Sequence, residues 1–172
     1  MQRIGRFFRV SQRQFDADFR NAFQHLPHIT VPVVASIPLP VRATVGSAGY
    51  DFFSPIDFSL SPGESILIPT GIRVIMDEGW VLAIFPRSGL GFKYRLQLDN
   101  TVGIIDSDYA YSDNEGHILF RMTNDNRESK QLHIHTGDAI AQGVFLSFGI
   151  TEDDQTTTPR NGGLGSTSVR KS

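Results

Sequence analysis

The sequence contains no cysteine, which excludes a disulfide framework and thiolate chemistry. No apolar run is long enough to span a membrane. Arginines interrupt the apolar pairs near the start of the chain, where a signal peptide would need an apolar core. The net charge of −2 leaves no excess of positive charge for bulk binding of nucleic acid. We therefore expect a soluble, cytoplasmic protein that has neither a nucleic acid nor a membrane as a partner.

The length of 172 residues is sufficient for one domain with a substantial core. Changes in pattern divide the chain into an N-terminal helical extension over residues 1–30, a β domain over residues 31–148 and a flexible C-terminal arm over residues 149–172. The arm is first polar and acidic, and then consists almost entirely of glycine and hydroxyl residues.

The extension has the signals of one amphipathic helix. Ser11 and Gln14 have the spacing of a capping box, and Val10 and Phe15 that of a hydrophobic staple. Further apolar residues recur at helical spacing before Pro27 stops the pattern, namely Phe19, Ala22 and Phe23. We expect this helix to pack on the β domain or on a neighbouring subunit.

From residue 31 onward the apolar period changes to two, which is typical of β-strands. The clearest runs are Glu64–Pro69, Gly71–Met76, Trp80–Phe85, His117–Thr123, Gln131–His135 and Ala139–Phe148. Many short strands separated by proline, glycine and aspartate predict an all-β fold, a jelly-roll-like sandwich or barrel that closes to avoid exposed edges.

An unusual stretch follows the middle strands. Gly103 and the Ile104–Ile105 pair predict a short buried strand, and Asp106 places a carboxylate at its end. A carboxylate beside an apolar run is either satisfied by donors or held for chemistry. Asn100 can read the edge of a base, and Tyr109 has a flat face with a polar tip. Taken alone, the stretch could equally be a hairpin turn.

The segment Pro86–Lys93 predicts one helical turn with free backbone N–H groups, an arrangement that binds anions. Arg87 adds a planar fork for phosphate oxygens, Ser88 adds a hydroxyl donor, and Lys93 adds a second positive charge. A capped surface turn is the alternative.

Three further stretches are weaker signals. Gly49 lets the backbone approach a neighbour closely, with Asp51 beside it, and Gln142 lies just inside the last predicted strand. The glycines and hydroxyls after Arg160 could wrap a polyphosphate, although the stretch is not a Walker loop because no lysine follows the last glycine.

In order and spacing, these five stretches resemble the five motifs of the trimeric dUTP pyrophosphatase (dUTPase) family. The matching segments are Ala-Gly-Tyr-Asp, Pro-Arg-Ser-Gly-Leu, Asn-x-Val-Gly-x-Ile-Asp-Ser-Asp-Tyr, Gly-Asp-x-Ile-Ala-Gln and Gly-Gly-x-Gly-Ser-Thr. One motif would be weak evidence, whereas five in order are highly specific. The resemblance implies a jelly-roll-like subunit and a homotrimer with three shared active sites that hydrolyse dUTP to dUMP and pyrophosphate, which keeps uracil out of DNA.

The resemblance also implies roles for individual residues. Asp106 would be the general base that activates a water for attack on the α-phosphorus, and Tyr109 would stack under the deoxyribose and exclude a 2′-hydroxyl. Asn100, with the backbone at Gly103 and Ile105, would read uracil. The triphosphate would be bound by the residues of the second and fourth motifs, namely Arg87, Ser88, Gly89 and Gln142.

The remaining implied roles concern support and closure. Asp51 would support the site, and the arm would close over the substrate through Arg160, Gly163, Leu164, Gly165, Ser166 and Thr167. No protein side chain is expected to ligate a metal directly, because Mg²⁺ would arrive on the substrate phosphates and be held through them and water.

The chain departs from the family pattern in three places. Leu164 stands where the family usually has a phenylalanine whose ring covers the uracil, so the arm would grip the base less well. Arg160 precedes Gly162 by two residues, whereas the common pattern places it three before. Residues 110–115 lengthen a turn that is normally tight and could add contacts between subunits.

Two other functions are compatible with this fold. A dCTP deaminase is related, but that branch usually has two serines at the position of Ser88 and Gly89 and a catalytic glutamate nearby, and neither is seen. A nucleotide-sensing or protein-binding module could also retain the fold, with the extra helix and the long turn as its contact surfaces.

Overall fold

In the computed structural model, which describes residues 2–26, 28–158 and 160, antiparallel β-strands are the predominant secondary structure. The strands are β1 (Gly5–Arg9), β2 (Val41–Arg42), β3 (Tyr50–Phe53), β4 (Phe58–Leu60), β5 (Ser65–Pro69), β6 (Ile72–Met76), β7 (Trp80–Pro86), β8 (Leu96–Leu98), β9 (Gly103–Asp106), β10 (Leu119–Asn124), β11 (Leu132–Ile134) and β12 (Ala139–Ser147). The helices are α1 (Gln12–Ala22) and α2 (Ser88–Tyr94), with 3₁₀ turns η1 (Val34–Ser36) and η2 (Ser107–Tyr111).

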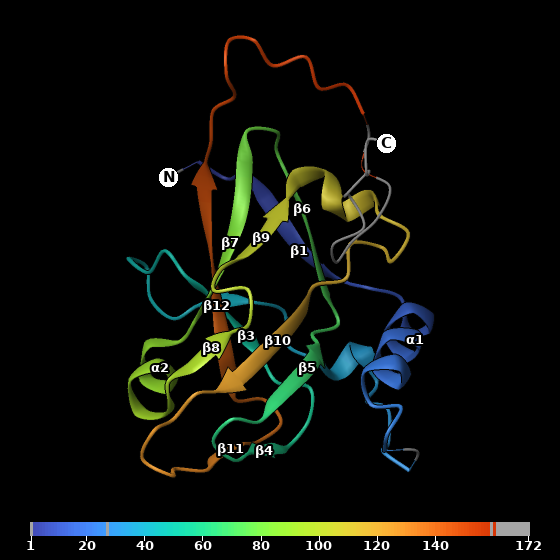
Figure 1. Ribbon diagram of the computed structural model, residues 1–172. Coiled ribbons are helices and arrows are strands. Elements are labelled where there is room, and N and C mark those ends of the chain that lie inside the picture. Colours follow the sequence, from blue (N-terminus) through green and yellow to red (C-terminus); the bar gives the residue numbers. More distant parts are fainter. Residues whose placement is uncertain (1, 27, 159, 161–172) are drawn as a thin grey trace, which may run out of the picture.

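The strands form a sandwich of the jelly-roll kind (Figure 1). One sheet has the order β2-β3-β12-β7-β9, a second has the order β5-β10-β8, and two pairs, β1-β6 and β11-β4, complete it. The mainly β prediction is confirmed, but the expected closure is wrong: β2 and β9 end the larger sheet, and β5 and β8 end the smaller one. Among the described helices, none is long and apolar enough to cross a membrane.

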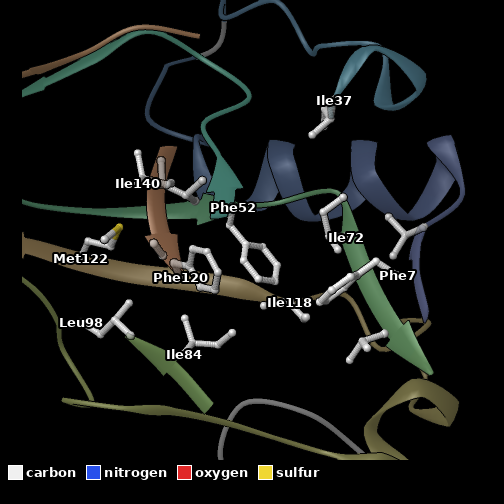
Figure 2. Close-up of a cluster of buried hydrophobic side chains, with 14 of the residues drawn as sticks. Phe7, Ile37, Phe52, Ile72, Ile84, Leu98, Ile118, Phe120, Met122 and Ile140 are labelled. Carbon is white, nitrogen blue, oxygen red and sulfur yellow. The ribbon is translucent and has the colours of Figure 1, made fainter. Parts of the chain in front are cut away.

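The core follows from the period-two patterns (Figure 2). Ile118, Phe120 and Met122 are at most 3 % exposed, as the alternation predicted, and they share one cluster with Phe52 and Ile84 from the larger sheet. Because alternate side chains point to one face, each strand places its large apolar residues between the sheets.

The first strand, β1, corrects the expectation that residues 1–30 are only helical. It pairs antiparallel with β6, with Phe7 opposite Val74, and joins the same body as the β domain. Phe7 is the only buried residue of this strand, and arginines flank its central residues. A strand with one buried side chain has no alternation for a sequence pattern to detect.

The predicted helix is present as α1, and it packs on the β body of its own chain. Ser11 is its N-cap and accepts a hydrogen bond from the Gln14 N–H at 3.1 Å. Phe15 and Phe19 are fully buried in the common core. The helix ends at Ala22, and Pro27, the predicted stop, lies outside the described residues.

The strand that leads to Asp106 is less buried than the sequence indicates. Ile104 is 57 % exposed, so the prediction that Gly103 and the Ile104–Ile105 pair form a buried strand is wrong for Ile104. β9 pairs with β7 and ends the larger sheet, and alternate side chains point to opposite faces, so Ile105 packs against the core while Ile104 points away from it. An edge position leaves the Asp106 end of the strand open to a ligand.

Candidate functional site

Asp106 lies where β9 ends and η2 begins. The chain turns at this residue, whose extended backbone caps η2, and its side chain is 44 % exposed. The carboxylate is therefore held by a strand on one side and a helical turn on the other, while still open to water. This is the position that a carboxylate needs in order to act on a solvent molecule.

A cavity of about 660 Å³ lies beside this strand end. Its walls include five of the residues predicted to bind substrate, namely Asn100, Gly103, Ile105, Tyr109 and Arg160. Asp106 is not part of the lining, but Arg160 is, and its guanidinium pairs with the Asp106 carboxylate. The structure thus brings the third motif and Arg160 of the arm together.

Arg160 contacts both acidic residues of the third motif. Its Nη2 donates to Asp106, and its Nε donates to Asp108 Oδ1 at 2.8 Å. In Figure 1, residues 148–158 leave β12 and cross over the end of the molecule toward η2. Arg160 therefore lies on the carboxylates of its own chain rather than beside Arg87. The other predicted arm residues lie outside the described part of the chain: Gly163, Leu164, Gly165, Ser166 and Thr167.

Tyr109 is a buried wall of the cavity, 8 % exposed. Its hydroxyl donates to the His117 carbonyl at 2.8 Å and accepts from Asn114 Nδ2 at 2.9 Å. Burial raises the pKa of the Tyr109 phenol and outweighs the opposing effect of the hydrogen bond from Asn114, while the charges of Asp18 and Arg160 have smaller effects in opposite directions. The phenol therefore stays neutral at physiological pH, and its ring offers an apolar face.

The first, second and fourth motifs form a separate cluster. Arg87 Nε lies 3.2 Å from Asp51 Oδ1, and Gln142 on β12 is the register partner of Asp51 on β3. The Gln142 amide donates to the Pro86 carbonyl at 3.3 Å. Gly49 lets the Gln142 side chain keep this position, because a Cβ at residue 49 would lie 2.6 Å from Gln142 Oε1 and would displace the end of that side chain. The Asp51 carboxylate thus orients the Arg87 fork.

A second cavity, of about 540 Å³, opens over this cluster and is lined by Arg87, Ser88 and Gly89 together with Lys93 and His133. The predicted helical turn is present as α2, whose N-cap, Arg87, makes no side-chain capping hydrogen bond. The first N–H groups of α2 therefore lack a side-chain acceptor, and the surrounding cations favour an anionic ligand.

The two clusters lie far apart within one chain. Asp106 is the register partner of Val81 near the start of β7, whereas Arg87 follows the end of that strand. Six residues of extended chain separate these positions, which corresponds to about 20 Å. One chain therefore cannot apply Asp106 and Arg87 to the same phosphate group.

Sequence reasoning missed an ion pair in the wall of the first cavity. Arg121 Nε lies 3.0 Å from Asp99 Oδ2, and both residues line the cavity. Thr123 also donates to Asp99. The signal was weak because Arg121 occupies an outward position on β10, where a charged residue is ordinary.

A metal that arrives on a substrate needs few protein ligands. Within residues 2–26, 28–158 and 160, no group of three or more histidine, cysteine, aspartate or glutamate side chains is placed to hold a metal ion. Mg²⁺ usually retains several waters and binds through one or two carboxylates together with substrate phosphates. The residues present fit that mode of binding.

The subunit is an antiparallel jelly-roll with the Asp106 carboxylate beside one cavity and the start of α2 in the lining of another. The dUTPase family model matches residues 35–168, and the chain belongs to this family. A relative, deoxyuridine 5′-triphosphate nucleotidohydrolase from Lactococcus lactis, is 43 % identical over 136 residues, covering 77 % of this chain and 89 % of the relative.

Solved structures agree with the family assignment. The dUTPase from Streptococcus mutans is 37 % identical, with a TM-score of 0.61 over 72 % of this chain and 95 % of that one. A mutant dUTPase from phage phi11 of S. aureus, 21 % identical, shares the fold with a TM-score of 0.61 over 90 % of this chain and 97 % of that one. The phage structure is described as coordinating a structural Mg(II) ion.

Proposed function

We propose that this protein is a dUTP diphosphatase, which hydrolyses dUTP to dUMP and pyrophosphate. The observation that carries the proposal is the position of Asp106, a water-accessible carboxylate next to a cavity lined by Asn100 and Tyr109, in a chain of the dUTPase family. A cavity of about 660 Å³ is also in the range that a nucleotide-sized ligand requires.

Asp106 serves as the general base. Its carboxylate orients a water and takes a proton from it while the water oxygen attacks the α-phosphorus. The bond between that phosphorus and the oxygen bridging to the β-phosphorus breaks, and pyrophosphate leaves. One carboxylate is sufficient at this point, because further negative charges would repel the triphosphate. The Arg160 guanidinium donates to Oδ2 of Asp106, so Oδ1 is the oxygen that can accept the proton while this contact is kept.

Tyr109, Asn100 and the strand backbone select the nucleoside. The buried Tyr109 ring packs under the deoxyribose and leaves no room for a 2′-hydroxyl, and the Asn100 amide reads uracil together with the backbone at Gly103 and Ile105. Mg²⁺ would be held by the substrate phosphates and water, with Asp51 as the carboxylate that would support it through that water, and it would neutralise part of the triphosphate charge.

Three chains form the active unit. Asp106 lies opposite Val81 of β7, and Arg87 follows Val81 by six residues of extended chain, so about 20 Å separates Asp106 from Arg87. The phosphate cluster of one chain must therefore serve the Asp106 of another. A cyclic homotrimer supplies three such head-to-tail sites. Arg87, Ser88, Gly89 and the supporting Gln142 then bind the phosphates of a nucleotide held in the neighbour's cavity.

The proposal is tested by incubating the purified protein with dUTP and Mg²⁺ and measuring dUMP, pyrophosphate and ammonia, with dCTP and UTP as parallel substrates. We expect equal amounts of dUMP and pyrophosphate from dUTP, and little turnover of the other two. Ammonia release from dCTP would instead identify a deaminase. Tight binding of dUTP without turnover would identify a nucleotide-sensing module.

A further inference from the structure

The segment that follows the catalytic carboxylate is fastened to α1 at two points. Glu115 accepts hydrogen bonds from the Ser11 N–H at 2.8 Å and from the Ser11 hydroxyl at 2.7 Å, which lower the pKa of its carboxyl group. Asp18, on the body of the helix, lies 2.5 Å from Nδ1 of His117. The lengthened turn after Tyr109 therefore contacts the helix of its own chain.

His117 is the central residue of this connection. Its side chain is 0 % exposed, and both ring nitrogens are used. The Gly71 N–H donates to Nε2 at 2.8 Å, so Nε2 is the acceptor and Nδ1 carries the proton that is donated to Asp18. The Phe15 ring packs against the imidazole at 5.9 Å, which holds it against the helix.

The backbone of the same residue holds the active-site tyrosine. The His117 carbonyl accepts from the Tyr109 hydroxyl, and Asn114 donates both to that hydroxyl and, at 3.3 Å, to the carbonyl. Gly116 lets the turn fold back this tightly, because a Cβ there would lie 2.6 Å from the Ala110 Cα. Displacement of His117 would therefore move the hydroxyl of Tyr109.

The electrostatics of Asp18 suit this role. Burial acts to raise the pKa of Asp18, but the hydrogen bonds from His117 and Gln14 outweigh it and hold that pKa below its ordinary value. Asp18 is therefore ionised at neutral pH, and its hydrogen bond from the buried imidazole is charge-assisted. Such a bond is a stronger restraint on the ring than one between neutral groups.

We propose that α1 positions the Tyr109 ring in the nucleotide cavity through Asp18 and His117, which makes Asp18 and His117 positioning residues for recognition of the deoxyribose. The proposal rests on the proposed function of the cavity. The helix lies outside residues 35–168, the part of the chain that matches the family model, so this support is an addition to the family core.

The test is Asp18→Ala in the full-length protein, with Asp16→Ala as the matched control. Asp16 lies on the same helix and accepts a hydrogen bond from Gln12 rather than from His117. For Asp18→Ala we expect the KM for dUTP to rise, and the preference for dUTP over UTP to fall, by roughly tenfold each, the change that one hydrogen bond makes to an equilibrium. The kcat for dUTP should stay within about twofold, because Asp106 is untouched.

A second variant separates positioning from general loss of stability. Phe19→Leu loosens the packing of a fully buried ring of α1 but leaves the Asp18–His117 hydrogen bond in place. At matched thermal stability, we expect the dUTP preference to fall in Asp18→Ala and to be retained in Phe19→Leu. Equal losses in the two variants, or a wild-type preference in Asp18→Ala, would overturn the proposal.

An NMR measurement on the protein without substrate tests the positioning of Tyr109 independently of dUTP hydrolysis. The NMR signal of the Tyr109 ring, in protein labelled at tyrosine and assigned with Tyr109→Phe, should shift in Asp18→Ala and not in Asp16→Ala. An unshifted Tyr109 signal in Asp18→Ala overturns the positioning role even if the wild type hydrolyses dUTP. Failure of the wild type to hydrolyse dUTP, with the shift present, contradicts the proposed function alone.

Discussion

Asp106→Asn should lower kcat for dUTP by about 10²- to 10⁴-fold, the range that general-base catalysis supplies, with little change in KM. The amide has nearly the same shape as the carboxylate, but it cannot take a proton from water. Because Asp106 is not part of the cavity lining, binding of the nucleotide should be retained. Pyrophosphate release under saturating dUTP and Mg²⁺ measures the effect.

The matched control is Asp108→Asn. Asp108 is two residues away and pairs with the same arginine, so this variant also removes a contact of Arg160 while leaving the proposed base intact. We expect a much smaller loss of kcat in the control. Equal losses in both variants would assign the effect to the arginine contact, and near-normal turnover in Asp106→Asn would remove Asp106 from the mechanism.

Arg87→Ala should lower kcat/KM for dUTP by about 10²- to 10³-fold, the size of effect seen when one partner of a hydrogen-bonded charge pair is truncated. The variant removes a phosphate ligand and also leaves the Asp51 carboxylate without its cation, 3.2 Å away, so that a negative charge then faces the triphosphate. Steady-state kinetics over a range of dUTP concentrations measure the change.

Two further variants show whether the loss of kcat/KM comes from the guanidinium of Arg87 itself. Arg87→Lys keeps the charge but not the planar fork and should fall between the wild type and Arg87→Ala. Arg95→Ala removes a nearby arginine that pairs with Asp125 outside the phosphate cavity, and it should behave as the wild type. If Arg87→Ala retained wild-type kcat/KM, the second cavity would not be the phosphate site.

The features predictable from sequence were those encoded locally. The alternation over residues 117–123 identified β10 and its buried face, and Ser11 with Gln14 identified the start of α1. The motifs predicted some of the cavity-lining residues, among them Asn100, Tyr109 and Arg87, because each motif is a continuous stretch. In these cases neighbouring residues carry the whole signal, through a fixed strand or helix period.

The features that could not be predicted depend on pairing between distant segments. The exposure of Ile104 depends on which face of β9 is covered by the rest of the fold, which is a property of tertiary packing rather than of the strand itself. The Asp18–His117 hydrogen bond joins residues 99 positions apart, and neither residue type indicates its partner. Arg160 likewise reached Asp106 only through the path of the chain after β12.

The most direct test of the account mixes two inactive variants. Asp106→Asn and Arg87→Ala chains, unfolded and refolded together in equal amounts, should regain about a quarter of wild-type dUTPase activity, because random assembly of a cyclic trimer pairs an intact Asp106 with a neighbour's intact Arg87 in one site of four. Each variant refolded alone should stay inactive. A mixture no more active than its components would contradict a site that is shared between chains.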